Sequence, residues 1–334
     1  SNVAINLGLN LFFLLALPGL AKQSNFWSSI FIEDHQINYI LWANIIASGA
    51  TLFLLSSIYA KLKWKFDKQL WKRMMKYAYP VLIAGVAFSV NETFDRILLK
   101  GLLPNDIADT QIGMYSACYK LALFMTLFAT AFRLGVEPFF FSHANSENPQ
   151  TSYARILEFF VAIGSCILLI VVVFADVLKV LIIRSEAYWE AMWIVPIILL
   201  ANFFLGIYHN LSVWYKITDR TRFGAIISVV GAVVTLVINI MFIPKFGYKA
   251  SAVATLTAYA LMALISFALG RSYYPIPYNL RKIGVYLVLS IVLAWISFYY
   301  FRSNYYFGII GIVVFLTAIY RMEKSNIQSI LKRN

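Results

Sequence analysis

Charged residues are scarce in this sequence. Asp, Glu, Lys and Arg make up only 13% of its 334 residues, whereas hydrophobic residues make up 61%. A soluble globular protein is about 25% charged and about 45–50% apolar. The shortage of charge therefore excludes a soluble enzyme and a disordered chain. Long, predominantly apolar runs, such as residues 156–175 and 223–243, instead predict an all-α polytopic membrane protein.

Cysteine and histidine are also rare. Cys118 and Cys166 lie inside apolar runs, where a cysteine behaves as a small buried hydrophobe, so a disulfide scaffold is excluded. The histidines His35, His143 and His209 are far apart in sequence and do not form a metal-type cluster. The chain also lacks a glycine-rich nucleotide loop and a catalytic triad, so we expect no cofactor and no enzymatic activity.

Ten apolar segments are long enough to be considered membrane spans. A helix needs about 20 residues to cross about 30 Å of hydrocarbon. The longest connections between them run to only 15 or 16 residues, which leaves no extramembrane domain for a catalytic site. The segments cover residues 2–21, 37–60, 77–99, 113–141, 156–175, 191–215, 223–243, 250–270, 283–300 and 305–320.

Basic residues are distributed unevenly over the connections. One alternate set holds 18 Lys and Arg residues and the opposite set holds 7. Because cytoplasmic loops carry the excess of Lys and Arg, the first set is expected to be cytoplasmic, together with both ends of the chain. This set comprises residues 61–76, 142–155, 216–222, 271–282 and 321–334. The basic run 61–76 then faces anionic lipid headgroups, and we expect no nucleic-acid partner.

Ionisable residues inside the spans are the first candidates for a functional site. Each costs roughly 2.5–3.5 kcal/mol at a helix centre, so it usually faces protein or water. Glu92, Asp95 and Arg96 are spaced by three and four residues and share one helix face. Lys120 lies at a similar depth in the next span, which predicts an ion pair with Glu92 or Asp95. Such a pair serves either the structure or the handling of substrate and protons.

Two further sets of polar residues lie in later spans. Arg133 and Glu137 are four residues apart near the inner end of their span, so they either neutralise each other or line an inward opening. Asn202 and His209 are seven residues apart and share a helix face. They are candidates for hydrogen bonds to sugars or to neighbouring helices.

Four stretches of the sequence resemble one family. Residues 239–259 (NIMFIPKFGYKASAVATLTAY) combine Asn, Ile-Pro, an aromatic-Gly pair and a run of small residues. Residues 94–99 (FDRILL), 112–121 (IGMYSACYKL) and 194–219 (IVPIILLANFFLGIYHNLSVWYKITD) follow the same order as in that family. Together they resemble the polysaccharide flippases of the multidrug/oligosaccharidyl-lipid/polysaccharide (MOP) exporter superfamily.

The resemblance implies a two-lobe transporter fold, similar to that of the multidrug and toxic compound extrusion (MATE) proteins. Each lobe has six helices, and two extra helices often follow. On this map residues 1–76 are the last two helices of the N-terminal lobe with a basic cytoplasmic loop. Residues 77–270 are the six-helix C-terminal lobe, and residues 271–334 are the two extra helices with a basic tail. Four helices of the first lobe are then expected to be missing, and residues 1–334 alone are expected not to transport.

The resemblance also implies a function. Such a flippase moves an undecaprenyl-pyrophosphate-linked oligosaccharide across the bacterial cytoplasmic (inner) membrane by alternating access, in surface polysaccharide or lipopolysaccharide biosynthesis. A pyrophosphate needs cationic partners, for which Arg96, Lys120 and Arg133 are available. Driven transport needs a coupling ion, H⁺ or Na⁺, acting through Glu92 or Asp95. Membrane lipids and glycan-assembly proteins are the other expected partners.

Two alternatives stay open at this point. A MATE-type drug or cation antiporter shares the superfamily and is expected to have a cavity dominated by acidic groups. A non-transporting membrane scaffold of glycan assembly would need no substrate cavity.

The orientation can be tested by thiol labelling in intact cells. In a variant without native cysteines, a cysteine at Asn105 should react with a membrane-impermeant thiol reagent, and one at Ser272 should be protected. The reason is that residues 271–282 belong to the basic set of connections, whereas residue 105 belongs to the opposite set. Labelling at position 272 together with protection at position 105 would reverse the orientation.

Overall fold

The computed structural model describes residues 2–32, 35–61, 65–144, 147–183, 185–302 and 304–331. Throughout these ranges the regular structure is helical, which confirms the predicted all-α class. Within the described ranges, nine helical segments are long and apolar enough to cross a membrane, and they coincide with nine of the ten predicted spans. The tenth predicted span lies in α5 (Lys68–Leu102), a helix of 35 residues. Polar and charged side chains interrupt the second half of this helix and reduce its apolar character.

The chain divides into two compact units, Ser1–Trp71 and Lys72–Asn334. In the first unit Asn6 donates a hydrogen bond of 2.7 Å from Nδ2 to Oδ1 of Asn44, so a polar contact joins α1 to α4. A five-residue π-helix interrupts the first span. The elements of this unit are α1 (Asn2–Leu11), η1 (Phe12–Ala16), α2 (Leu17–Ala21), α3 (Asn25–Ile30) and α4 (Gln36–Tyr59).

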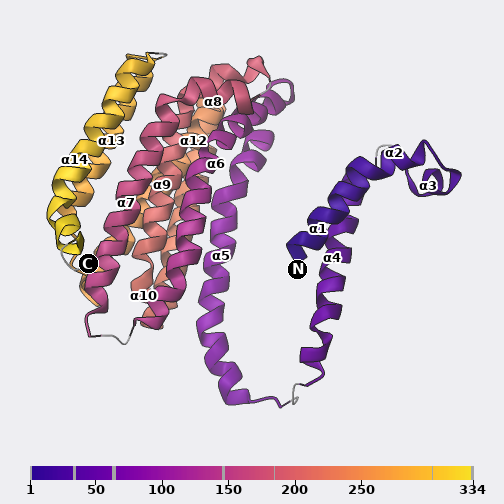
Figure 1. Cartoon of the computed structure of the whole chain (residues 1–334), viewed down its shortest axis with the longest axis horizontal. Helices are drawn as coiled ribbons and strands as arrows, with labels where there is room; N and C mark the ends of the chain where they lie inside the picture. Colours follow the sequence, from indigo (N-terminus) through magenta and orange to yellow (C-terminus); the bar gives the residue numbers. More distant parts are fainter. Residues whose placement is uncertain are drawn as a thin grey trace. The chain divides into compact units, whose positions relative to one another are not determined.

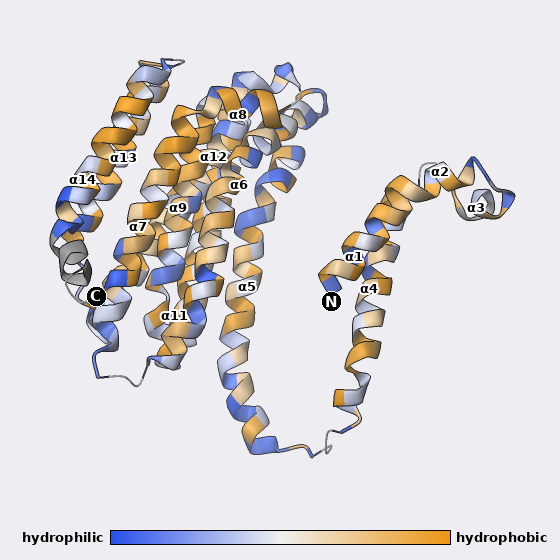
Figure 2. Cartoon of the chain, viewed as in Figure 1, coloured by the Kyte–Doolittle hydropathy of each residue, from blue (hydrophilic) through white to orange (hydrophobic). Residues whose placement is uncertain are grey.

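The second unit is a helical bundle. Helices α6, α7, α9 and α12 run side by side in it (Figure 1). Hydrophobic residues dominate the middle of these helices, and hydrophilic residues gather at the connections (Figure 2). After α5 its elements are α6 (Asn105–Ser142), α7 (Pro149–Val173), α8 (Ala175–Ile182), η2 (Glu186–Ile194), α9 (Val195–Leu211), α10 (Val213–Ile217), α11 (Thr221–Phe246), α12 (Tyr248–Tyr273), α13 (Leu280–Tyr299) and α14 (Tyr305–Leu331).

Small residues allow the helices of this bundle to approach closely. On α12 the side chains of Ala252, Ala254 and Ala258 are fully buried in a helix that packs against both α9 and α11. Gly164 of α7 and Gly206 of α9 leave room for phenylalanine rings of the facing helix, because an added Cβ would collide with them. The bundle core therefore depends on small residues as much as on large apolar ones.

Helices α13 and α14 are fastened to the bundle by polar contacts near one end. Lys282 of α13 places Nζ 2.6 Å from Oε1 of Glu323 on α14 and 3.6 Å from Oε2 of Glu158 on α7. Tyr286 donates a further hydrogen bond of 2.9 Å to Oε1 of Glu323. One ammonium group thus joins three helices.

A second fastening lies at the opposite end of α13. Arg302, in the connection between α13 and α14, donates two hydrogen bonds of 3.0 Å to the carboxylate of Asp176 on α8. Partial burial alone would raise the pKa of Asp176, but the hydrogen bonds from Arg302 and Lys179 outweigh it and hold the pKa below its usual value. This contribution to stability is therefore present at neutral pH and is lost only as the pH falls through that lowered value.

Candidate functional site

A buried carboxylate lies where four helices of the second unit meet. Asp95 of α5 is only 2% exposed. Its Oδ2 accepts hydrogen bonds from the hydroxyl of Tyr115 on α6 (2.8 Å) and from Oγ1 of Thr255 on α12 (3.0 Å). Its Oδ1 accepts one of 2.8 Å from Nδ2 of Asn239 on α11. Each of the three neighbouring helices thus supplies one neutral donor to the same carboxylate.

Two further hydrogen bonds join these helices near Asp95. Ser251 donates from Oγ to Oδ1 of Asn239 (2.9 Å), and Thr235 donates from Oγ1 to Oδ1 of Asn91 (2.6 Å). The Nδ2 atom of Asn91 is buried and has no hydrogen-bond partner within the described ranges.

Glu92 and Arg96 lie beside this network on the same helix. The carboxylate of Glu92 accepts hydrogen bonds from the hydroxyl groups of Tyr119 on α6 and Tyr259 on α12. Arg96 does not pair with either carboxylate through a hydrogen bond that the structure shows. Its Nε donates to Oγ of Ser116 (3.3 Å), its Nη1 donates to the backbone oxygen of Glu92 (3.1 Å), and its guanidinium lies 5.3 Å from the ring centre of Tyr119.

The predicted ion pair of Lys120 with Glu92 or Asp95 is wrong. Lys120 is exposed and forms no ion pair with any residue that the structure describes. Lys120 follows Tyr119, whose hydroxyl group reaches Glu92, so Lys120 lies at the expected level along α6. Its side chain, however, lies on a different side of that helix. Tyr115 and Tyr119, one turn apart, face α5, and Lys120 points about 100° away from Tyr119 around the same helix. Neutral donors therefore stand where the cation was expected.

The polar residues around Asp95 follow a regular spacing in the sequence, which could have been used to predict the network. Three helices each carry two polar residues four positions apart, and these residues make up the network. Such spacing places both members on one face of an α-helix. The pairs are Asn91 with Asp95, Thr235 with Asn239, and Ser251 with Thr255.

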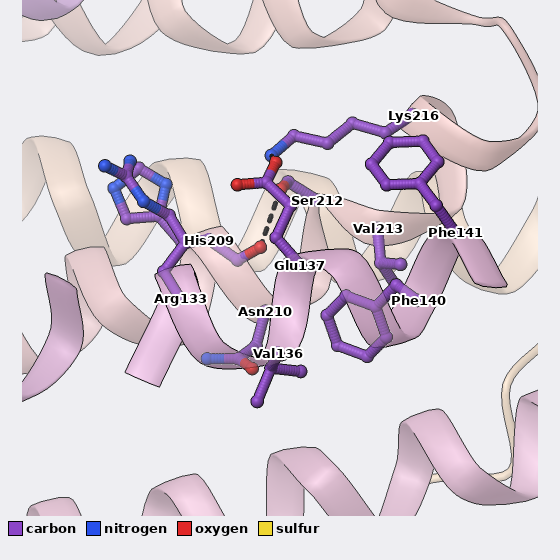
Figure 3. A pocket seen from close by; sticks show the side chains of 10 residues that line it. All are labelled: Arg133, Val136, Glu137, Phe140, Phe141, His209, Asn210, Ser212, Val213 and Lys216. Carbon is purple, nitrogen blue, oxygen red and sulfur yellow. Dashed lines mark hydrogen bonds and ion pairs between the residues drawn. The ribbon is translucent and has the colours of Figure 1, made fainter. Parts of the chain in front are cut away.

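A small pocket that contains charged side chains forms the second candidate site, between α6, α9 and α10 (Figure 3). Glu137 of α6 accepts a hydrogen bond of 2.7 Å at Oε1 from Nζ of Lys216 on α10. Arg133 also lines the pocket, with its guanidinium beside the ring of His209 (Figure 3). The full lining is Arg133, Val136, Glu137, Phe140, Phe141, His209, Asn210, Ser212, Val213 and Lys216.

The predicted neutralisation of Glu137 by Arg133 is therefore wrong as well. Glu137 pairs with Lys216, which arrives from another helix. Arg133 is half-buried and forms no hydrogen bond or ion pair with the described residues. Both residues line the small pocket, and the interpretation that they line an inward opening stays a prediction.

The structure thus sorts the candidate residues into two groups. Asp95 is the centre of the buried network, and Glu92 and Arg96 lie beside it. Arg133, Glu137 and His209 line the pocket. Lys120 joins neither group, and Asn202 is buried in α9 with its Nδ2 unpaired in the described chain and does not line this pocket.

The arrangement around Asp95 predicts a specific coupling of substitutions. Asn239→Leu removes one donor from a buried carboxylate, so it should lower the free energy of unfolding by about 1–3 kcal/mol. Combined with Asp95→Asn, the effects should be strongly non-additive, because the two side chains share a hydrogen bond.

Lys120→Met serves as the matched control for this cycle. It should change stability little by itself and add to Asp95→Asn without coupling, as measured by unfolding of the purified protein in detergent. Coupling between Asp95 and Lys120 that exceeds the coupling between Asp95 and Asn239 would contradict the observed network.

Comparisons with known proteins agree with this fold. The model of the polysaccharide biosynthesis protein family matches residues 26–142. No curated protein matches the chain by sequence. Among solved structures, the lipid II flippase MurJ in an inward closed conformation is similar, with a TM-score of 0.63 and 16% identity. A MOP superfamily transporter from Pyrococcus furiosus is also similar, with a TM-score of 0.50 and 18% identity.

The coverage of these structures is unequal. The match spans 86% of this chain but 63% of the MurJ chain, and 68% of this chain but 52% of the Pyrococcus furiosus chain. The chain therefore spans between half and two thirds of the length of the structures that it resembles. The predicted fold is confirmed: the chain is a polytopic all-α membrane protein whose fold is similar to that of these two structures, and its residues 26–142 match the polysaccharide biosynthesis protein family.

Proposed function

We propose that the protein is a flippase for an undecaprenyl-pyrophosphate-linked oligosaccharide in the bacterial cytoplasmic membrane. It would move this lipid by alternating access during surface polysaccharide or lipopolysaccharide biosynthesis, without changing it chemically. The observation that carries the proposal is Arg133, a half-buried cation without an acidic partner in the described chain, in a pocket that also holds Lys216 and His209.

An unpaired arginine at this depth requires a physical reason. A charged side chain within a membrane span is costly and usually pairs with another group or faces a water-filled path. The guanidinium of arginine matches phosphate oxygens with two parallel hydrogen bonds, which makes it a frequent phosphate ligand. Arg133 together with Lys216 fits the pyrophosphate of such a lipid better than it fits a neutral sugar.

The charged residues that line the pocket do not favour the alternative function, a cation antiporter. A pocket for a cationic drug needs an acidic group that is free to bind it. Here the one carboxylate of the lining, Glu137, already has Lys216 as its partner, whereas the unpaired charge is the positive one of Arg133. A scaffold without transport would not need a charged pocket inside its helices.

Arg133→Gln tests this proposal through glycan export in a flippase-deficient bacterial strain that expresses the full gene product. Loss of a charge-assisted hydrogen bond is worth about 1.5–3 kcal/mol, so export should fall at least tenfold. The matched control is Arg155→Gln, since Arg155 is exposed on α7 and lies outside the pocket lining. Wild-type export by the Arg133 variant, or equal loss in both variants at equal expression, would contradict the proposal.

We further propose that the network around Asp95 carries the coupling ion, H⁺ or Na⁺. Asp95 is a buried carboxylate, and its partners in the structure are a tyrosine, a threonine and an asparagine. Tyr115 and Thr255 each bring a hydroxyl oxygen and Asn239 brings its amide nitrogen. A carboxylate in a low-dielectric interior attracts a proton or a hard metal cation. Binding of either ion would remove the net charge of the network and change how α5 is held to α6, α11 and α12.

The ion can be detected by its effect on stability. Anything that binds the folded state alone raises the unfolding temperature. Exchanging K⁺ for Na⁺ at constant ionic strength, or lowering the pH, should raise the unfolding temperature of the purified chain by a few degrees. The same changes should have little effect on the Asp95→Asn variant. If neither ion shifts the wild type, or if the shift persists in Asp95→Asn, Asp95 does not carry the ion.

A further inference from the structure

The pocket between α6, α9 and α10 contains one carboxylate among its described lining residues, that of Glu137. Glu137 places Oε1 2.7 Å from Nζ of Lys216, and Arg133 lies one helical turn before Glu137 on the same face of α6. The carboxylate thus shares the pocket with two basic side chains, Arg133 of α6 and Lys216 of α10.

We propose that the carboxylate of Glu137 occupies the place of the substrate's anionic group and closes the site until the substrate displaces it. In this assignment Lys216 is a second ligand of the pyrophosphate, together with Arg133. Glu137 is the residue that sets the binding threshold. The inference rests on the proposed function, because it takes the pyrophosphate group of the lipid as the competing anion.

The strength of the ion pair permits such an exchange. The side chain of Lys216 is 26% exposed and that of Glu137 is 35% exposed, so water reaches both. Exposed and half-exposed ion pairs contribute little to stability, and one anion can replace another on the same ammonium group. A pyrophosphate brings more negative charge than a carboxylate and can bind Arg133 and Lys216 at once. The pocket therefore favours the exchange once the substrate arrives.

The backbone near Lys216 supports its role in a binding site. Helix α9 ends at Leu211, Ser212 hydrogen-bonds through Oγ to the backbone oxygen of His209 (2.6 Å), and the short helix α10 begins at Val213. Lys216 of α10 reaches across to Glu137 of α6 (Figure 3).

A purely structural ion pair between α6 and α10 is the competing explanation, and the two differ in the effect of removing Glu137. Glu137→Gln keeps the size of the side chain and removes its charge. With the competing carboxylate gone, the purified chain should bind inorganic pyrophosphate about tenfold more tightly than the wild type, as measured by titration calorimetry at fixed salt. Lys216→Gln should weaken this binding about tenfold.

The matched control is Glu158→Gln. Glu158 also faces a lysine, Lys282, at 3.6 Å, but it lies in the fastening between α7, α13 and α14 and not in the pocket. This variant should leave the affinity for pyrophosphate unchanged. Should Glu137→Gln fold poorly, Glu137→Asp retains the charge on a shorter side chain and should give an affinity between those of the wild type and Glu137→Gln.

The outcomes separate this inference from the proposed function. Unchanged or weaker pyrophosphate binding in the Glu137 variants, or no binding by any variant, overturns the role of Glu137. If the affinities change as expected but the full gene product does not export glycan, the anion site stands and the flippase proposal fails. If export depends on Arg133 but Glu137→Gln binds pyrophosphate no more tightly, the flippase proposal stands and Glu137 is only a structural partner of Lys216.

Discussion

One buried carboxylate organises the second unit of this protein. Asp95 lies at 2% exposure and receives hydrogen bonds from α6, α11 and α12. A buried charge without such donors would be far too costly, so the four helices must keep their donors directed at one point. The small residues of α12 allow it to approach α9 and α11 closely. Much of the polar sequence of the spans is explained by this single requirement.

The pocket near Glu137 also contains a charged side chain without an oppositely charged partner in the described chain, but there the charge is positive. Asp95 is an anion surrounded by neutral donors, whereas Arg133 is a cation without an acidic partner among the residues described. The two sites lie at different positions along α6, at Tyr115 and at Arg133 and Glu137. In the proposed mechanism, the carboxylate network responds to the coupling ion and the basic pocket responds to the pyrophosphate of the substrate. Separate sites of opposite charge are what a transporter of an anionic lipid driven by a cation needs.

The sequence predicted the helices well and their contacts poorly, for physical reasons. Long apolar runs determine where a helix lies, so nine predicted spans coincide with helices that meet the requirements of a membrane span. Helical spacing also grouped Glu92, Asp95 and Arg96 correctly on α5. It could not show which face of α6 would meet α5, and so Lys120 was paired wrongly. Nor could helical spacing show that Glu137 would pair with Lys216, 79 positions away in sequence, and not with Arg133. The ordinary hydroxyl and amide groups around Asp95 carry no charge to attract notice, although their spacing of four residues was visible.

The central claim is that the pocket selects an anion attached to a lipid. Its most direct test is the affinity of the purified chain for two lipids with the same tail, undecaprenyl pyrophosphate and uncharged undecaprenol, with tetraphenylphosphonium as a cationic competitor. The account predicts that the pyrophosphate lipid binds at least tenfold more tightly than undecaprenol and that the cation does not displace it. Equal affinity for the two lipids, or displacement by the cation, would contradict it.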